Sequence, residues 1–484
     1  MTRSATVVFT LLFFAAALLT LGAWAARRTH NAADFVLANR RLGVWFTALG
    51  YSANVLNAWM LLLMSAAAFV WGLAALWLWA AALFGCIVNL FYVAPRLRIA
   101  SAGQGAVTVI QVLSADAGDR LQPVVVRSAV FITVAMLLLQ TGVSVRAAGE
   151  VLVSDYGFDY VGSIVLCVAV VSVCIFAGGM RAAAASDVAQ SVLLMVVGLL
   201  LLAPAMAAIG GVEQLQIAIA ALDPTWTDAF AGKTGIVAIA FSAGGVGFGL
   251  AMIGQPQALN RFMAVRDEAT LQRGRWIALV WAALLLAVVL VVGWAAHVLY
   301  AGLERPEHAL LAIATRPLPP WLSAILVLAI LAAIVLSIGS PLLVIASSLA
   351  ADLKRGSAPA SLVWLKVAVV VAAVLAFLIG VYAPGGILDL SLFAFTTLGA
   401  ALGPLVLVRL SGKRIRPGST LGAMWSAFVL SVLFHLLPDS PGDFLERVLP
   451  FVAALGIALT GGERRRNPDR ADRAQETVHD RIPI

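Results

Sequence analysis

The sequence predicts an all-α polytopic membrane protein, and three observations support this fold class. Hydrophobic residues make up 62% of the 484 residues and charged residues only 12%, whereas about 25% of the residues in a soluble protein are charged. About thirteen apolar runs are each long enough to form a transmembrane helix, for which about 20 residues suffice. The connections between these runs alternate between many and few basic residues, which is the pattern that membrane topology imposes.

These observations divide the chain into a transmembrane region, residues 1–462, and a charged tail, residues 463–484, that we expect to be disordered. The apolar runs are centred near residues 15, 57, 84, 138, 168, 198, 245, 287, 335, 372, 398, 428 and 452. Arginine-rich connections, such as the one containing Arg261 and Arg266, are assigned to the cytoplasm together with the tail. An odd number of helices then places the N-terminus outside a cell (inner) membrane and the C-terminus in the cytoplasm.

The first apolar run, Thr6 to Ala25, resembles the apolar region of a signal peptide. Only Arg3 precedes it, however, while Arg27 and Arg28 follow it. Because positive charge is retained on the cytoplasmic side, this distribution favours a first transmembrane helix.

The net charge of +8 does not indicate a nucleic-acid partner, because the basic residues lie in short loops rather than along one amphipathic face. The three cysteines, Cys86, Cys167 and Cys174, lie in apolar runs without metal-ligand spacing, so neither a disulfide nor a zinc site is expected. The sequence contains none of the common hydrolase, metalloprotease or nucleotide-binding motifs. We therefore expect no enzyme activity and no cofactor, with a small solute and membrane lipid as partners; the sequence does not indicate an oligomeric state.

The second apolar run, Leu42 to Trp71, carries polar residues near its centre. These are Tyr51, Ser52, Asn54 and Asn57. An unpaired polar group costs several kcal/mol in hydrocarbon, so such residues face a protein interior or a cavity. Polar groups in a broken helix are typical of a transporter's binding site, although amide residues also join helices through hydrogen bonds alone.

The seventh run contains a second interruption, SAGGVGFGLAMIGQP from Ser242 to Pro256. Its glycines and its proline weaken helix propagation, leave backbone groups free to bind a ligand, and would allow this span to hinge. The two interrupted runs are five runs apart, which is the spacing that an inverted repeat of five plus five helices requires. We expect the two repeats to cover about residues 43–210 and 235–410.

Four motifs resemble the sodium:solute symporter family, most closely its sodium/proline symporter branch. The motifs are DFVLANRRLG from Asp34 to Gly43, GGMRAAAASDVAQ from Gly178 to Gln190, GQPQALNRFMA from Gly254 to Ala264, and LGAALGP from Leu398 to Pro404. The resemblance covers about residues 1–460 and implies a LeuT-type fold, with spans two to six repeated in inverted orientation as spans seven to eleven. It also implies that solute and ion bind between the broken helices.

The resemblance implies a sodium site, but two positions around it have changed chemistry. The site residues that correspond to the family's ligands are Ala53, Leu56, Ala333 and Ser337. One hydroxyl of the family's adjacent pair corresponds to Leu336, and an aspartate of the branch corresponds to Val55. Because sodium needs about five or six oxygens in place of its water, we expect a degraded site, with either weakly held Na+ or H+ as the coupling ion.

The resemblance and the amides of the interrupted runs together predict a solute site. Its residues are Asn54, Asn57, Ala58, Trp59, Gln140, Phe248, Met252, Gln255 and Pro256. We expect the amides to supply hydrogen bonds and Trp59, Phe248 and Met252 to form apolar walls. Three aromatic residues of the branch correspond to Gln140, Phe248 and Met252, so the resemblance implies a small amphipathic solute that need not be proline.

Asp187 corresponds to the acidic residue of the family's Thr-Asp pair, here Ser186 and Asp187, near the cytoplasmic end of the sixth span. It could line a gate or an ion path, or it could cap a helix N-terminus. Proton relays in membranes use an acidic residue or a histidine near the midplane, but Asp187 and Glu150 both lie toward helix ends. A proton-coupled mechanism would therefore require Asp187 to carry the proton. Arg146 and Glu150, at i and i+4, are expected to form a local ion pair.

These residues predict a secondary active transporter, similar to a solute:cation symporter, that moves a small organic solute such as an amino acid or a carboxylate by alternating access. A transporter-derived solute sensor or an uncoupled facilitator is the alternative, because the sodium site has lost oxygen ligands. An ion channel would need a repeated filter or a charged ring, and the sequence contains neither.

Overall fold

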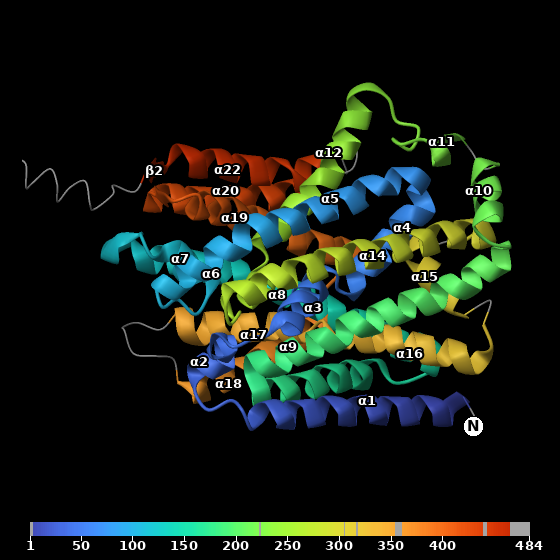
Figure 1. The fold of residues 1–484 in the computed structure, drawn as a ribbon, viewed down its shortest axis with the longest axis horizontal. Coiled ribbons are helices and arrows are strands. Elements are labelled where there is room, and N and C mark those ends of the chain that lie inside the picture. The colour runs from blue at the N-terminus through green and yellow to red at the C-terminus, as the bar shows by residue number, and fades with distance from the viewer. Residues whose placement is uncertain are drawn as a thin grey trace, which may run out of the picture.

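The computed structural model describes residues 3–221, 224–303, 305–315, 318–353, 361–438 and 443–464. Within these ranges the chain is almost entirely helical, and most long helices run along the long axis of the molecule (Figure 1). The fold is therefore all-α, as the composition and the apolar runs predicted.

The helices of the first half lead from the N-terminus through the first broken span. Their bounds are α1 (Arg3–Ala26), α2 (Ala32–Leu37), η1 (Ala38–Arg40), α3 (Val44–Val55), α4 (Ala58–Trp71), η2 (Gly72–Ala75), α5 (Leu76–Ile87), η3 (Val88–Val93), α6 (Ala94–Gly103), α7 (Val109–Ser114), α8 (Gly118–Tyr156), α9 (Tyr160–Ile209) and α10 (Val212–Ala220). The second half contains α11 (Pro224–Thr227), α12 (Gly235–Ala251), η4 (Met252–Gly254), α13 (Pro256–Met263), α14 (Glu268–Tyr300), η5 (Pro306–His308), α15 (Ala309–Thr315), α16 (Pro320–Leu336), α17 (Gly339–Ser347), η6 (Ser348–Asp352), α18 (Leu362–Tyr382), α19 (Ile387–Leu410), β1 (Lys413–Ile415), α20 (Pro417–His435), α21 (Phe444–Arg447), α22 (Leu449–Thr460) and β2 (Gly462–Arg464).

Short elements gather at the two ends of the bundle. Helices α2 and α7 and strand β2 lie at one end, whereas α10, α11 and the start of α1 lie at the other (Figure 1). The first described helix therefore starts at the end opposite the last strand, as an odd number of crossings requires.

Nine helical stretches in the described residues are long and apolar enough to cross a membrane. Two of them, Trp59–Gly103 and Tyr160–Ile209, have 45 and 50 residues, about twice the length that one crossing needs. Each bends at a glycine with positive φ, Gly72 at +54° and Gly179 at +53°, a backbone conformation that glycine adopts without strain. The exact number of crossings stays a prediction.

Both predicted helix interruptions are confirmed. Helix α3 ends at Val55 and α4 begins at Ala58, with Asn57 capping α4 by accepting a hydrogen bond from the Met60 amide at 3.2 Å. Helix α12 ends at Ala251 and α13 begins at Pro256, because proline is well suited to the first position of a helix. The five-plus-five relation between the halves stays a prediction.

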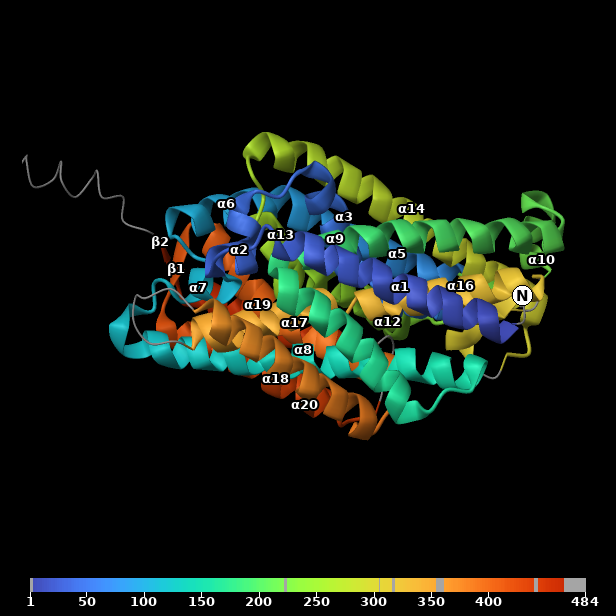
Figure 2. The same ribbon diagram turned by 90° about the horizontal axis from the view of Figure 1, so that it is seen from below.

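The broken helices lie inside the bundle. Helix α3 packs against α9 and α14, while α19 packs against α8 and against the η4 turn of the second break. Helix α1 lies along α9 on the outside (Figure 2). The two breaks are thus held between long helices, where they can form a site.

Three local expectations have clear outcomes. The three cysteines are buried, as their apolar surroundings predicted. Arg146 Nε lies 2.9 Å from Glu150 Oε1, which confirms that ion pair. The prediction that the tail is disordered is wrong for its first two residues, Glu463 and Arg464, because they pair with β1 in an antiparallel ladder. The rest of the tail, residues 465–484, lies outside the described residues.

Candidate functional site

A small closed cavity lies at the break of the second span. Its lining residues come from five neighbouring spans and are Ala53, Asn54, Asn57, Gln140, Thr141, Ser144, Asp187, Gln190, Gln257, Ser337 and Pro341. The volume of about 10 Å³ is enough for about one water molecule. An organic solute would therefore need the surrounding helices to separate before it could enter.

The structure brings six of the predicted site residues to this cavity and leaves the others outside its lining. Those in the lining are Ala53, Asn54, Asn57, Gln140, Asp187 and Ser337. Those outside it are Leu56, Trp59, Phe248, Met252, Gln255, Pro256 and Ala333, all of them buried. The side chain of Ala58 lies outside the described part of the chain.

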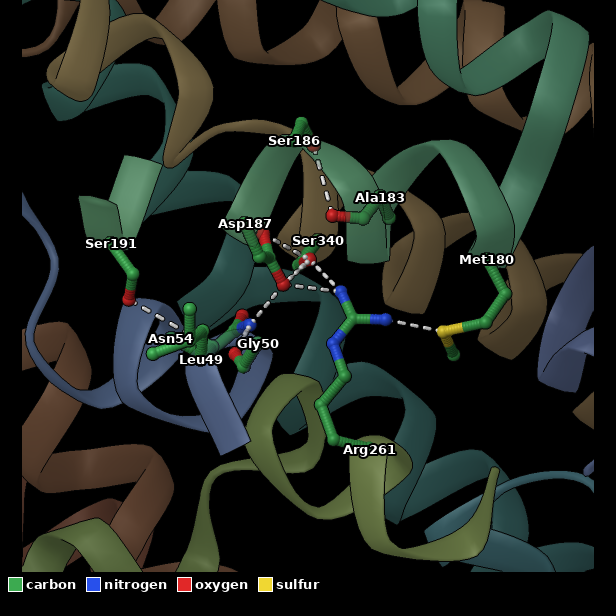
Figure 3. Close-up of polar contacts among 10 residues, drawn as sticks. All are labelled: Leu49, Gly50, Asn54, Met180, Ala183, Ser186, Asp187, Ser191, Arg261 and Ser340. Carbon is green, nitrogen blue, oxygen red and sulfur yellow. Dashed lines mark hydrogen bonds and ion pairs between the residues drawn. The ribbon is translucent and has the colours of Figure 1, made fainter. Parts of the chain in front are cut away.

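Asp187 lies at the centre of a polar network that joins α3, α9, α13 and α17 (Figure 3). Its Oδ2 accepts a hydrogen bond from Asn54 Nδ2 at 2.6 Å and lies 2.5 Å from Arg261 Nη2. The Ser340 hydroxyl lies 3.0 Å from both carboxylate oxygens and also contacts Arg261. The carboxylate is thus bound by side chains of α3, α13 and α17.

These contacts correct one interpretation of Asp187. It lies eight residues after the bend at Gly179, well inside the second part of α9, and its partners are side chains rather than free amides of a first turn. The helix-cap interpretation is therefore wrong.

Arg261 is the functional-site residue that the charge pattern misplaced. It was assigned to a cytoplasmic connection, yet only 1% of it is exposed, and its guanidinium contacts Asp187, Ser340 and the Met180 sulfur. The reason is that α13 turns inward after the break, so Arg261 enters the protein opposite Asp187. Its position in the GQPQALNRFMA motif was the available signal.

Gln190 and Gln257 also line the cavity, although neither was predicted as a site residue. Both atoms of the Gln190 amide and the Gln257 Oε1 are buried without a partner in the described structure, as is Gln140 Nε2. Gln255, by contrast, uses its Nε2 to bind the carbonyl oxygens of Ala251 and Phe395 at 3.0 and 2.8 Å. Here Gln255 holds the break in place, and the neighbouring amides are the ones that remain free.

Three aromatic residues pack together beside the breaks. Trp59 lies 6.3 Å from Phe248 and 5.3 Å from Phe395 between ring centroids, and Phe248 stacks on Phe395 at 5.4 Å. Phe395, in α19, was not predicted, because no polar or motif signal distinguishes it from a core residue. The apolar wall expected from Trp59 and Phe248 is therefore a three-ring cluster.

A family model for the sodium:solute symporter family matches residues 35–429. The chain belongs to this family. It is similar to the osmoregulated proline transporter OpuE of Bacillus subtilis, with 31% identity over 86% of each chain. It is also similar to the high-affinity proline transporter PutP of Bacillus subtilis (29%; 90% of this chain, 93% of PutP) and to a sodium/proline symporter of Haemophilus influenzae (28%; 94% and 93%).

Solved structures support the same fold for this symporter-family chain. A Na+-coupled sialic acid symporter superposes with a TM-score of 0.79 over 95% of this chain and 99% of its own, at 17% identity. Mhp1, a nucleobase-cation-symport-1 family transporter, superposes with a TM-score of 0.58 over 89% and 94%, at 15% identity. The chain is therefore a membrane-spanning solute transporter with a LeuT-like helical fold.

The sodium positions implied by the family are only partly gathered in this member. Ala53 and Ser337 line the cavity. The Ser337 hydroxyl donates a hydrogen bond to the Ile334 carbonyl at 2.6 Å, so its oxygen keeps acceptor capacity. Leu336 and Val55, the two positions at which the resemblance implied a change of chemistry, are buried hydrocarbons outside the lining.

Proposed function

We propose that this chain is a secondary active transporter that carries a small amino acid, or a similar small organic solute, by alternating access. The observation that carries the proposal is the closed polar cavity at the helix break, with amide atoms that lack partners. Buried polar groups are normally hydrogen-bonded. A solute that supplies the missing partners would therefore bind there.

The free amide atoms favour a zwitterion over an anion. Gln140 and Gln190 offer NH2 donors, which suit a carboxylate, while Gln190 and Gln257 offer carbonyl acceptors, which suit an ammonium group. Among the described residues, the charged groups beside them are Asp187 and Arg261, which already neutralise each other. A solute with net charge would find no counter-charge, and burying an unpaired charge is costly. Proline, which the names of the similar transporters specify, is the first solute to test.

Opening of the site is expected at the two breaks. In the proposed cycle, α3 and α4 hinge about Leu56 and Asn57, and α12 and α13 hinge about the η4 turn before Pro256. Asn54, Asn57 and Gln140 then bind the solute together with Gln190 and Gln257, while Trp59, Phe248 and Met252 form its apolar side. The gate on one side is the network around Asp187.

Sodium is expected to bind weakly in this cycle. Of the carried-over positions, Ala53, Leu56 and Ala333 can offer only backbone oxygens and Ser337 a hydroxyl. Leu336 offers no side-chain oxygen. A hard cation held by too few oxygens competes poorly with water. The proposal accordingly includes either loosely coupled Na+ or no coupled sodium at all.

Uptake by the purified protein in proteoliposomes tests the proposal. We expect saturable uptake of proline or another small neutral amino acid, with at most weak stimulation by an inward Na+ gradient. Leu336→Ser should increase that stimulation, because it restores a hydroxyl beside Ser337. Strong sodium-driven accumulation by the wild type would contradict the degraded site, and stimulation by an inward proton gradient alone would identify H+ as the coupling ion.

Gln190→Leu separates solute binding from folding. Both amide atoms of Gln190 lack partners, so replacing the side chain with a similar-sized apolar one should leave thermal stability unchanged or higher. Uptake at low solute concentration should nevertheless fall about five- to thirtyfold, which corresponds to the loss of one or two hydrogen bonds of about 1 kcal/mol each to the solute. Unchanged uptake by Gln190→Leu would show that the solute does not bind in this cavity.

The degraded sodium site also supports a second candidate, a solute sensor or uncoupled facilitator. A facilitator would equilibrate solute without accumulation under any gradient. A sensor would bind solute, seen as a ligand-dependent rise in melting temperature, without uptake. Either result would replace the transporter cycle proposed above.

A further inference from the structure

Asn89 connects the two broken spans, although no motif pointed to it. It lies in η3, a π-helical turn of the third span, and its side chain is fully buried. Its Nδ2 donates hydrogen bonds to the Tyr51 hydroxyl in α3 at 3.1 Å and to the Met252 carbonyl in η4 at 2.9 Å. Single π-helical turns are uncommon and often lie at functional sites.

The Met252 carbonyl needs a partner because of the sequence that follows it. In a continuous helix this carbonyl would accept a hydrogen bond from the amide four residues later. That residue is Pro256, which has no N–H. Asn89 therefore supplies, from another span, the donor that the chain itself cannot supply at this break.

Close backbone packing holds Asn89 in place. One turn before it, Gly85 lies against the carbonyl of Gly249, where a Cβ on Gly85 would overlap that oxygen. On the other side the Tyr51 ring stacks on Phe262 of α13, with centroids 4.9 Å apart. The third span is thus fixed to α12, and the second span, through Tyr51, to α13, so the Asn89 amide between them has little freedom to leave the break.

We propose that Asn89 is a positioning residue that sets the conformation of the seventh-span break, and through it the shape of the solute site. The proposal rests on the proposed function, since it concerns how Met252 and Pro256 are presented to the solute. With the Asn89 bond in place, the η4 turn has one conformation. Without it, the free Met252 carbonyl favours other conformations in which the site binds solute less well.

The test uses full-length protein in proteoliposomes and proline as the first solute, or whichever small amino acid the wild type takes up. Asn89→Leu keeps the size of the side chain and removes the donor. We expect KM for uptake to rise about tenfold, which is the effect of one lost hydrogen bond, with less than a threefold change in Vmax. Tyr51→Phe removes the other bond of Asn89, together with the hydrogen bond between the Tyr51 hydroxyl and Cys86, and should leave KM within about twofold of the wild type.

A rescue variant distinguishes positioning from general packing. Pro256→Ala returns an N–H that can bind the Met252 carbonyl, so Asn89→Leu/Pro256→Ala should recover part of the KM lost in Asn89→Leu. A residue with a merely structural role would not show such recovery, because the packing defect at position 89 would persist. Melting temperatures of all variants, measured in detergent, show whether each protein is folded.

The outcomes separate this inference from the proposed function. Raised KM in Asn89→Leu with recovery in the double variant supports it. Unchanged KM, or a lower melting temperature and Vmax with no recovery, overturns it while the transporter function stands. Absence of uptake by the wild type under every gradient overturns both. If Asn89→Leu does not fold, Asn89→Ala, which removes the donor without adding bulk or charge, must show the same rise in KM.

Discussion

Arg261 and Asp187 carry opposite charges in the interior of a membrane protein, and each is only 1% exposed. Two such charges stay buried because each satisfies the other and because Asn54 and Ser340 bind the carboxylate as well. Asp187 also belongs to the lining of the cavity. At the scale of single residues, this pair therefore joins the cavity to a buried ionic network.

Loss of Arg261 should destabilise the protein strongly. Arg261→Gln leaves the Asp187 carboxylate buried without its counter-charge, which costs about 3–5 kcal/mol. Thermal unfolding in detergent should show a large fall in melting temperature. Asp187→Asn/Arg261→Gln should recover part of the loss, because neither charge then remains unpaired.

An exposed ion pair provides the control for this prediction. Arg266 Nε lies 2.8 Å from Asp267 Oδ2, but the Arg266 side chain is 66% exposed. Arg266→Gln should change stability by less than about 1 kcal/mol, because solvent screens such pairs. If Arg261→Gln and Arg266→Gln lowered stability equally, burial of the Asp187–Arg261 pair would not contribute to the stability of the protein.

The two breaks are the elements on which the site depends, and each is stabilised differently. Asn57 caps α4, so the first break ends in a conventional N-cap. The second break is held from outside by Gln255, by Asn89 and by close contact with α19. The conformation of the seventh-span break depends on these contacts, so movement of the helices that make them should change that conformation.

Variants of Asn57 separate its capping role from solute binding. Asn57→Ala removes the acceptor for the Met60 amide and should cost about 1 kcal/mol of stability. Asn57→Ser keeps a capping oxygen and should retain stability while removing the amide from the cavity. If uptake falls in both variants, Asn57 binds solute; recovery of uptake in Asn57→Ser would assign it to the cap alone.

Gly254 is predicted to be intolerant of a methyl group. A Cβ at Gly254 would lie 2.5 Å from the Gly403 amide nitrogen and 2.6 Å from the Gly399 carbonyl oxygen. Gly254→Ala should push the break away from α19, lowering uptake and melting temperature together. Gly456→Ala in α22, where nothing lies within 4 Å, should stabilise by about 0.5–1 kcal/mol. If Gly254→Ala kept the uptake and the melting temperature of the wild type, the seventh-span break and α19 would have to move apart at little cost.

At the scale of the whole molecule, the ends of the bundle differ in charge as well as in structure. Arginines gather near α2, α6 and β1, whereas the opposite end contains the exposed Glu213 of α10. The positive-inside rule places the arginine-rich end in the cytoplasm. The proposed topology therefore has the N-terminus outside and the C-terminus inside.

Single cysteines test this orientation. We expect a membrane-impermeant thiol reagent added to intact cells to label Glu213→Cys but to label Arg414→Cys only after the cells are opened, because the two exposed positions lie at opposite ends. The three native cysteines are buried and should give little background. Labelling of Arg414→Cys in intact cells would reverse the topology.

The sequence alone determined the features that depend on local chemistry. Hydrophobic runs predict helices because a bilayer leaves backbone groups no other partner. Glycines with Pro256, and the polar residues around Asn57, predicted both breaks, because each weakens a helix wherever the chain lies. The family resemblance indicated the fold, and together with the amides it placed Asn54, Asn57 and Gln140 in one predicted solute site, with Asp187 as a separate candidate for a gate or an ion path.

Only the tertiary structure decided which side chains meet. Arg261 looked like a loop cation, and its pairing with Asp187 depends on the inward turn of α13. Asn89 and Phe395 looked like ordinary residues of apolar helices, and Gln190 ended a family motif without a predicted role, because the contacts that distinguish them come from other spans. Pairings between distant segments arise from helix packing, and periodicity and composition along the chain carry no record of them.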